Sequence, residues 1–255
     1  MAGSAFAESD FKPAVVIPVY NHEEAIGVTL VDVLSYGYPV LLVDDGSSSE
    51  CRDLLVQLSE QHADWVNLIR LEQNAGKGAA VKAGLRQLFQ EGYSHAVQVD
   101  ADGQHDLQDL PLFMATAKDA PEALVIGYPR YDKSVPAHRY YARYLTHVWV
   151  WINTLSLAIK DTMCGFRVYP LAKTVEMLEQ ESCGDRMDYD TEVIVRWAWR
   201  GFSVRNLPTR VIYPIDGVSH FNVVKDNILI SRMHARLFFG MLLRLPGILR
   251  NKFNG

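Results

Sequence analysis

The chain has 255 residues, 49% of them hydrophobic, which is enough to bury a large core and excludes a disordered protein. Its formal net charge of -5 disfavours a nucleic-acid partner. The three cysteines, Cys51, Cys164 and Cys183, are irregularly spaced, which excludes a disulfide framework and a CxxC zinc site and predicts free thiols in a reducing compartment.

The first residues, MAGSAFAESDF, contain no basic segment followed by an apolar one. No stretch of the chain reaches the roughly 18 uninterrupted apolar residues of a spanning helix. We therefore expect a cytoplasmic protein that is neither secreted nor anchored by a transmembrane helix.

Short apolar runs alternate with amphipathic, helix-like segments from the start of the chain onward. This alternation predicts an α/β fold with a mainly parallel sheet covered by helices on both faces, and ligands bound beyond the carboxyl ends of the strands. The predicted strands are 14–19, 40–43, 66–71, 96–99 and 124–126.

Polar clusters follow the first three predicted strands. They read Pro18-Val19-Tyr20-Asn21-His22-Glu23, then Asp44-Asp45-Gly46-Ser47, then Asn74-Ala75-Gly76-Lys77-Gly78. Each has a structural explanation, such as Asn21 capping the next helix. Together they indicate a nucleotide site, because Asp44 or Asp45 could accept from a base N–H or from ribose hydroxyls, while Lys77 and nearby backbone N–H groups approach phosphate. No Walker loop and no GxGxxG is present, which weakens the ATPase and dinucleotide readings.

The fourth predicted strand leads into the sequence DADGQ at residues 100–104. Alternate side chains of an extended segment point the same way, so Asp100, Asp102 and Gln104 could converge on one ion. Carboxylate and carbonyl oxygens are the ligands that Mg²⁺ and Mn²⁺ prefer, and an ion there could hold a diphosphate. A polar turn is the structural alternative.

The end of the chain is basic, with ten Lys or Arg against two Asp or Glu in residues 196–255. Residues 224–250 mix apolar side chains with arginines at helical intervals and contain Pro246. This pattern is typical both of a helix that lies on an anionic membrane surface and of a packed helix with solvated arginines. Both remain open.

Six motifs occur in a fixed order between about residues 12 and 225: VVIPVYNHEE, LLVDDGSSS, NAGKGAAVKAGL, VQVDADGQHD, DTMCGFRVYP and MDYDTEVIVRWAWRGFSVRNLPTRVIY. In these motifs the chain resembles the family-two inverting glycosyltransferases of the GT-A fold, in the branch with dolichyl-phosphate mannosyltransferases and polyprenyl-phosphate glycosyltransferases. The resemblance implies a GT-A domain over 1–223, with a nucleotide-sugar half (12–128), an acceptor half (129–223) and a separate helical segment over 224–255. It implies transfer of a sugar from a UDP- or GDP-linked donor to a lipid-linked or other glycan acceptor, in cell-envelope glycan or glycolipid synthesis, by a peripheral protein at the inner face of the membrane.

The resemblance also assigns residues. Mn²⁺ or Mg²⁺ would bind Asp100, Asp102 and Gln104. From its place in a Gly-containing loop, His220 is a further candidate ligand, ahead of His105, which follows the DADGQ segment. The nucleotide-sugar site would comprise Pro18, Tyr20, Asn21, Glu23, Asp44, Asp45, Gly76, Lys77, Asp100, Ala101 and Asp102.

On the acceptor side, the resemblance places Arg139 and Arg167 near phosphate, where the planar guanidinium suits bidentate contacts. Cys164 stands where the polyprenyl-phosphate branch commonly has Ser. We expect Asp190 to be the base for a hydroxyl acceptor, or to position a lipid phosphate that needs no base; Asp188 and Glu192 are alternatives that the sequence does not separate. Asp102, Asp190 and Arg167 are thus the predicted catalytic residues.

Two other functions fit parts of the pattern. A sugar-1-phosphate nucleotidyltransferase also combines an α/β sheet with a carboxylate-bound metal, but the GxGxR-type loop is missing after the first strand. A non-catalytic sugar-nucleotide-binding module would keep the fold and bind a donor without transferring it.

Overall fold

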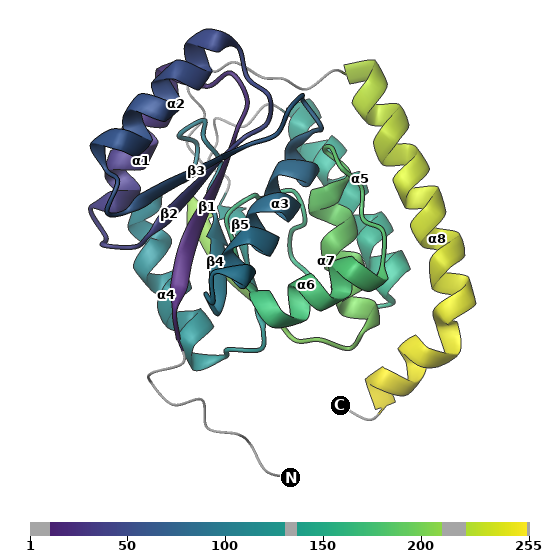
Figure 1. Ribbon diagram of the computed structural model, residues 1–255. Coiled ribbons are helices and arrows are strands. Elements are labelled where there is room, and N and C mark those ends of the chain that lie inside the picture. The colour runs from purple at the N-terminus through teal and green to yellow at the C-terminus, as the bar shows by residue number, and fades with distance from the viewer. Residues whose placement is uncertain (1–10, 131–136, 211–222, 254–255) are drawn as a thin grey trace.

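The computed structural model describes residues 11–130, 137–210 and 223–253. Its centre is a seven-stranded sheet with the order β3-β2-β1-β4-β6-β5-β7. The strands are β1 (Pro13–Val19), β2 (Val40–Asp44), β3 (Val66–Arg70), β4 (His95–Gln98), β5 (Leu124–Arg130), β6 (Arg167–Pro170) and β7 (Val204–Arg210) (Figure 1).

Strands β1 to β4 are parallel, and β5 is parallel to β7. Strand β6 runs antiparallel between β4 and β5, with Gln98 opposite Arg167 and Ile126 also opposite Arg167. The prediction of a mainly parallel sheet is therefore confirmed, and the five predicted strands lie where β1 to β5 lie. The sequence did not identify β6 or β7 as strands.

Helices cover both faces of the sheet, as Figure 1 shows. They are α1 (Glu23–Leu34), α2 (Ser49–Gln61), α3 (Lys77–Gln90), the short 3₁₀ helix η2 (Leu107–Asp109), α4 (Leu110–Asp119), α5 (Ala137–Thr154), α6 (Leu171–Gln180), α7 (Tyr189–Trp199) and α8 (Val223–Phe253). Side chains at alternate strand positions point to opposite faces. Val16 therefore packs with the core formed by α3, α6 and α7, and its neighbours Val15 and Ile17 pack with that of α1, α2 and α4. Burial of both faces explains why these strands read as continuous apolar runs.

Helix α8 packs along the outside of α5 and α7 (Figure 1). Met233, Leu237, Met241 and Ile248 are buried in that contact, at helical spacing. No helix in the described part of the chain is long and apolar enough to cross a bilayer. The division of the chain near residue 223 stays a prediction.

Candidate active site

Hydrogen bonds join the polar clusters that follow β1, β2 and β3. The amide oxygen of Asn21, which has a φ of 51°, accepts from the N–H of Ser48 at 2.8 Å, and the N–H of Asn21 donates to the Ser47 hydroxyl at 3.1 Å. Asn21 thus links two loops, and the expectation that it caps the following helix is wrong, since α1 begins after His22 without a side-chain cap.

Asp45 fastens the loop before α3. Its carboxylate accepts from the N–H of Ala75 at 2.8 Å and from the N–H of Gly76 at 2.9 Å. Burial raises the pKa of Asp45, and these two hydrogen bonds oppose the shift. The carboxylate of Asp44 accepts from the N–H of Ser47 at 2.8 Å and pairs with Arg70. Both carboxylates, expected at the nucleoside, therefore shape the loops of the site, and at 1% and 2% exposure they offer little surface to a ligand.

Asp100 lies at the centre of a charged cluster at the end of β4. The Lys77 ammonium is 2.9 Å from its carboxylate, Nε2 of His105 is 3.3 Å from it, and the Gln98 amide donates to it at 3.3 Å. Burial alone would raise the pKa of Asp100, but Lys77 and then His105 outweigh burial and hold that pKa well below its usual range. Asp100 is thus an ionised carboxylate at the carboxyl end of a central strand.

The remaining residues of DADGQ form a tight turn. The N–H of Gln104 donates to the Asp102 carboxylate at 3.0 Å, and the carbonyl of Ala101 accepts from the Thr29 hydroxyl at 3.4 Å. Gly165, just before β6, packs its backbone on Asp100 so closely that a Cβ added there would lie 2.3 Å from Oδ2. The turn and the segment 164–167 therefore form one unit around Asp100.

Asp190 is brought to this cluster from the other half of the chain. It lies in the first turn of α7, with Oδ2 3.1 Å from the Lys77 ammonium and Oδ1 3.3 Å from Arg167. Asp188 and Glu192 instead face Arg236 of α8, which is 2.6 Å from Glu192 and 3.8 Å from Asp188. The geometry therefore separates the three carboxylates that the sequence left open, since these contacts join Asp190 alone to the Asp100 cluster.

Arg167 is fully buried, whereas the sequence predicted a phosphate contact for it. Its guanidinium donates to the carbonyl oxygens of Thr162, Cys164 and Asp190 at 2.7 to 2.8 Å. Burial would lower the pKa of Arg167, but Tyr169 and Asp190 outweigh it and raise the pKa, so the side chain stays charged. Because these acceptors hold the guanidinium inside the protein, we correct the assignment: Arg167 positions Asp190 and the loop before β6.

Asp161 holds the loop before β6 in place through an ion pair and two backbone hydrogen bonds. It pairs with Arg143 of α5 at 2.6 Å and accepts from the N–H groups of Met163 and Cys164, each at 2.7 Å. Burial and then the charge of Asp161 raise the pKa of the Cys164 thiol to about 12, so Cys164 is a neutral, buried side chain. Because Cys164 is buried beside the negative charge of Asp161, its surroundings do not favour a contact with a charged acceptor phosphate.

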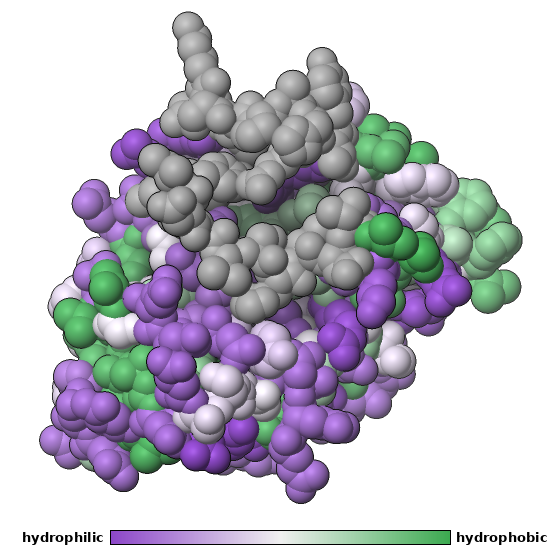
Figure 2. All heavy atoms as spheres, turned by 90° about the horizontal axis from the view of Figure 1, so that it is seen from above, coloured by the Kyte–Doolittle hydropathy of each residue, from purple (hydrophilic) through white to green (hydrophobic). Residues whose placement is uncertain are grey.

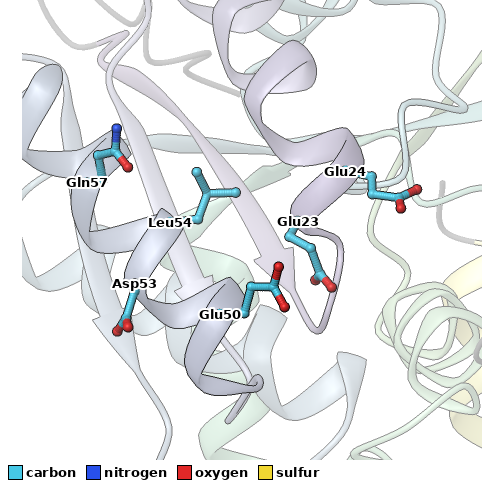
Figure 3. Close-up of a pocket in the computed structure, with 6 residues that line it drawn as sticks. All are labelled: Glu23, Glu24, Glu50, Asp53, Leu54 and Gln57. Atoms are coloured by element: carbon cyan, nitrogen blue, oxygen red, sulfur yellow. The ribbon is translucent and has the colours of Figure 1, made fainter.

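Glu23, at the start of α1, is a further predicted nucleotide ligand. It lines a hollow between α1 and α2 that is otherwise formed by Glu24, Glu50, Asp53, Leu54 and Gln57. In Figure 3 the carboxylates of Glu23 and Glu50 point into the same space. This hollow contains no other residue of the predicted site.

The residues around Asp100 fit a hard divalent cation. A carboxylate oxygen of Asp100 lies 3.3 Å from Nε2 of His105, whose buried Nδ1 has no hydrogen-bond partner among the described residues, and Asp102 lies two positions further along the same turn. Carboxylate and imidazole groups suit Mn²⁺ and Mg²⁺. Within the described ranges, no group of three or more His, Cys, Asp or Glu side chains is placed to hold a metal ion. The sequence ranked His105 below His220 as a ligand, and that ranking stays a prediction, although His105 does lie beside Asp100. His220 and the side chain of Arg139 lie outside the described residues.

Comparisons with known proteins place this site in a family. The model of Glycosyl transferase family 2 matches residues 14–175, which is more than half of the chain. The chain belongs to glycosyl transferase family 2. The match runs from β1 to the middle of α6, and so includes the segments that carry Asn21, Asp45, Lys77 and Asp100.

Relatives of this family 2 enzyme include named lipid-phosphate transferases. Dolichyl-phosphate beta-glucosyltransferase of Mus musculus is 29% identical over 206 residues, covering 71% of this chain and 61% of that protein. Undecaprenyl-phosphate 4-deoxy-4-formamido-L-arabinose transferase of Photorhabdus laumondii is 29% identical over 164 residues, covering 62% and 49%. The chain thus spans about half to three fifths of the length of these relatives. An uncharacterized protein of Methanocaldococcus jannaschii is 27% identical over 216 residues and is covered to 92%.

Solved structures with the same fold are also glycosyltransferases. TarS of S. aureus (residues 1–349) in complex with UDP-GlcNAc superposes with a TM-score of 0.58 at 16% identity, covering 95% of this chain and 73% of that one. GalNAc-T7 with UDP, GalNAc and Mn²⁺ gives a TM-score of 0.59 at 13% identity, covering 89% and 48%. The GT-A fold predicted from the sequence is thereby confirmed, and the family 2 chain is a glycosyltransferase.

Proposed function

We propose that this glycosyltransferase moves a sugar from a nucleoside diphosphate donor to a polyprenyl-phosphate acceptor, with inversion at the anomeric carbon and with the help of Mn²⁺ or Mg²⁺. The observation that carries the proposal is the meeting of Asp100, from the nucleotide-sugar half, with Asp190, from the acceptor half, across the Lys77 ammonium. The proposed nucleotide-sugar half and the proposed acceptor half of the chain thus meet at Lys77, at the edge of the sheet. An inverting transfer needs this arrangement, because the acceptor oxygen must attack opposite the departing diphosphate.

The donor half would bind the diphosphate. Asp100 and Asp102 would hold the cation, with His105 beside them, and the ammonium of Lys77 would approach the phosphate oxygens. A bound Mn²⁺ or Mg²⁺ supplies Lewis-acid stabilisation of the charge that develops on the leaving diphosphate. Asp45 contributes by fixing the loop that carries Lys77.

Asp190 would orient the acceptor. A polyprenyl phosphate is already anionic and needs no base, and the named relatives act on dolichyl and undecaprenyl phosphates. The contacts of Asp190 with Lys77 and Arg167 keep its carboxylate in one orientation. A positioning role therefore fits this carboxylate better than free proton transfer.

The acceptor is a membrane lipid, and α8 offers a surface for the bilayer. Its outer side carries Val224, Ile228, Phe239, Leu242, Leu243 and Leu249, all exposed, and Arg232 and Arg250 lie among them. In Figure 2, which looks onto the edge where the parallel strands end, apolar side chains gather at the right-hand rim, the side of α8 in Figure 1. Apolar side chains with basic neighbours favour binding to an anionic membrane surface.

The donor is tested by thermal unfolding with UDP, GDP, CMP, dTDP and ATP, each with and without Mn²⁺, because a ligand that binds the folded state raises the midpoint. We expect one nucleoside diphosphate to raise it in a Mn²⁺-dependent way. The protein is then given the matching sugar nucleotide together with undecaprenyl phosphate, and the anomeric configuration of the product is determined by NMR.

The metal assignment is tested by Asp102→Asn, which should abolish Mn²⁺-dependent turnover, while the control Asp53→Asn, at an exposed position, should retain it. Transfer at the wild-type rate by Asp102→Asn would disprove the metal assignment.

Asp190→Asn separates the acceptor types. A modest loss of transfer, up to about tenfold, is expected for a phosphate acceptor, whereas a base that accepts a hydroxyl proton contributes about 10² to 10⁴-fold. A loss in that larger range, with binding of the donor unchanged, would show that the acceptor is a hydroxyl.

A further inference from the structure

The ammonium of Lys77 lies where two carboxylates of the site converge. Its Nζ is 2.9 Å from each oxygen of Asp100 and 3.1 Å from Oδ2 of Asp190. The side chain is 21% exposed, so the packed chain encloses it only in part. Lys77 therefore pairs at the same time with Asp100, from the proposed nucleotide-sugar half, and with Asp190, from the proposed acceptor half.

The backbone beneath Lys77 is fixed. Gly76 has a φ of 105°, and a Cβ there would lie 2.5 Å from the carbonyl oxygen of Asp185. A Cβ on Gly78 would lie 2.4 Å from that of Tyr189, so the first turn of α3 is pressed onto the segment that leads into α7. Any movement of the ammonium must come from rotation of the four-carbon side chain, which is flexible in lysine.

Lys82, one turn further along α3, shows the contrasting arrangement. Its ammonium donates to the carbonyl oxygens of Cys183 and Gly184 and to Asp185 at 2.6 to 3.1 Å, and the side chain is 10% exposed. Those three protein acceptors account for all three of its protons. Lys82 is a fixed anchor, whereas one partner of Lys77, Asp100, is a carboxylate expected to receive a metal ion.

Resting on the proposed function, we propose that Lys77 competes with the divalent cation for Asp100 and is drawn to the diphosphate when the donor binds. A dication that arrives alone must displace the ammonium or lie beside a like charge, which is unfavourable. A diphosphate offers the ammonium new oxygen partners and so frees Asp100 for the metal. Lys77 thereby makes the binding of metal and the binding of donor depend on each other, beyond any direct metal–phosphate bond.

The test measures Mn²⁺ binding directly, by the EPR signal of the free ion, with and without the nucleoside diphosphate found in the thermal screen. Wild type is compared with Lys77→Met, with Lys77→Gln in case the first variant folds poorly, and with Lys173→Met, which removes a surface lysine paired with Glu122. Circular dichroism checks the fold of each.

We expect Lys77→Met and Lys77→Gln to bind Mn²⁺ alone about tenfold more tightly than wild type, a size typical of coupling between two sites. The diphosphate should tighten Mn²⁺ binding less in these variants than in wild type, and Lys173→Met should match wild type. Unchanged or weaker Mn²⁺ binding by both Lys77 variants, with wild type still responding to diphosphate, would overturn the role of Lys77 and leave the proposed function intact. Absence of Mn²⁺ binding in every protein, with and without diphosphate, would overturn both.

Discussion

Replacing Gly165 by alanine tests whether the segment before β6 fixes the position of Asp100. The new Cβ would lie 2.3 Å from Oδ2 and 2.6 Å from Oδ1 of Asp100. Because favourable contacts between heavy atoms lie near 3.5 to 4.0 Å, about 1 Å of movement is needed. Lys77 and His105 contact the same carboxylate, so its displacement also disturbs those contacts.

The expected effect is larger on function than on stability. Overpacking of this kind costs about 1–3 kcal/mol, which for a chain of this size lowers Tm by about 2–4 °C per kcal/mol. A 1 Å misplacement of a reacting group costs on the order of 10²-fold in rate. We therefore expect Gly165→Ala to remain folded with a moderately lower Tm and to lose about 100-fold in kcat/KM.

The assay measures sugar transfer over a series of Mn²⁺ concentrations, beside a thermal melt. Gly27→Ala is the control, because a Cβ at this position of α1 would meet no atom within 4 Å. Alanine there should stabilise the helix by about 0.5–1 kcal/mol and leave transfer unchanged. Wild-type transfer and Mn²⁺ dependence in Gly165→Ala would refute the reasoning, because the carboxylate would then not need its present position.

Three further predictions concern stability. Burial lowers the pKa of His234 to about 4, below its unfolded value of 6.5. The stability that the neutral imidazole contributes is therefore present above pH 6.5 and is lost as pH falls from 6.5 towards 4. His234→Phe should flatten this part of the pH profile of the free energy of unfolding, measured in urea, and an equally steep profile in the variant would contradict this prediction. Asp161→Asn leaves Arg143 without its buried partner. We expect it to lower the free energy of unfolding in urea by about 3 kcal/mol and to remove much of the transfer activity. A loss of less than about 1 kcal/mol in the free energy of unfolding would mean that this ion pair is not important. Arg236→Met removes the cation of α8 that contacts buried Glu192, and should increase amide exchange in α8 while β1 stays protected; equal exchange rates would argue against this attachment.

Much of the donor half of the fold could be read from the sequence. The runs that become β1, β2 and β4 are buried almost throughout, so their apolar pattern is local and strong. The polar residues that follow β1 to β4 fall at one edge because these strands are parallel. Strand β6 has four residues and lies between β4 and β5, pairing antiparallel with both. Its sequence, RVYP, lacks the continuous apolar run that marks β4, and its pairing depends on partners far away in the chain.

The sequence by itself pointed to a set of charged residues for the proposed site: the carboxylates after β4, the lysine that opens α3 and three carboxylates around the start of α7. Only the tertiary structure decided which of them lie together. It brought Asp190 rather than Asp188 or Glu192 to Lys77, and it enclosed Arg167, which the family resemblance had placed near phosphate. The physical reason is that a charged side chain is satisfied by whichever opposite charge or carbonyl the packed chain places beside it, and those partners come from distant segments.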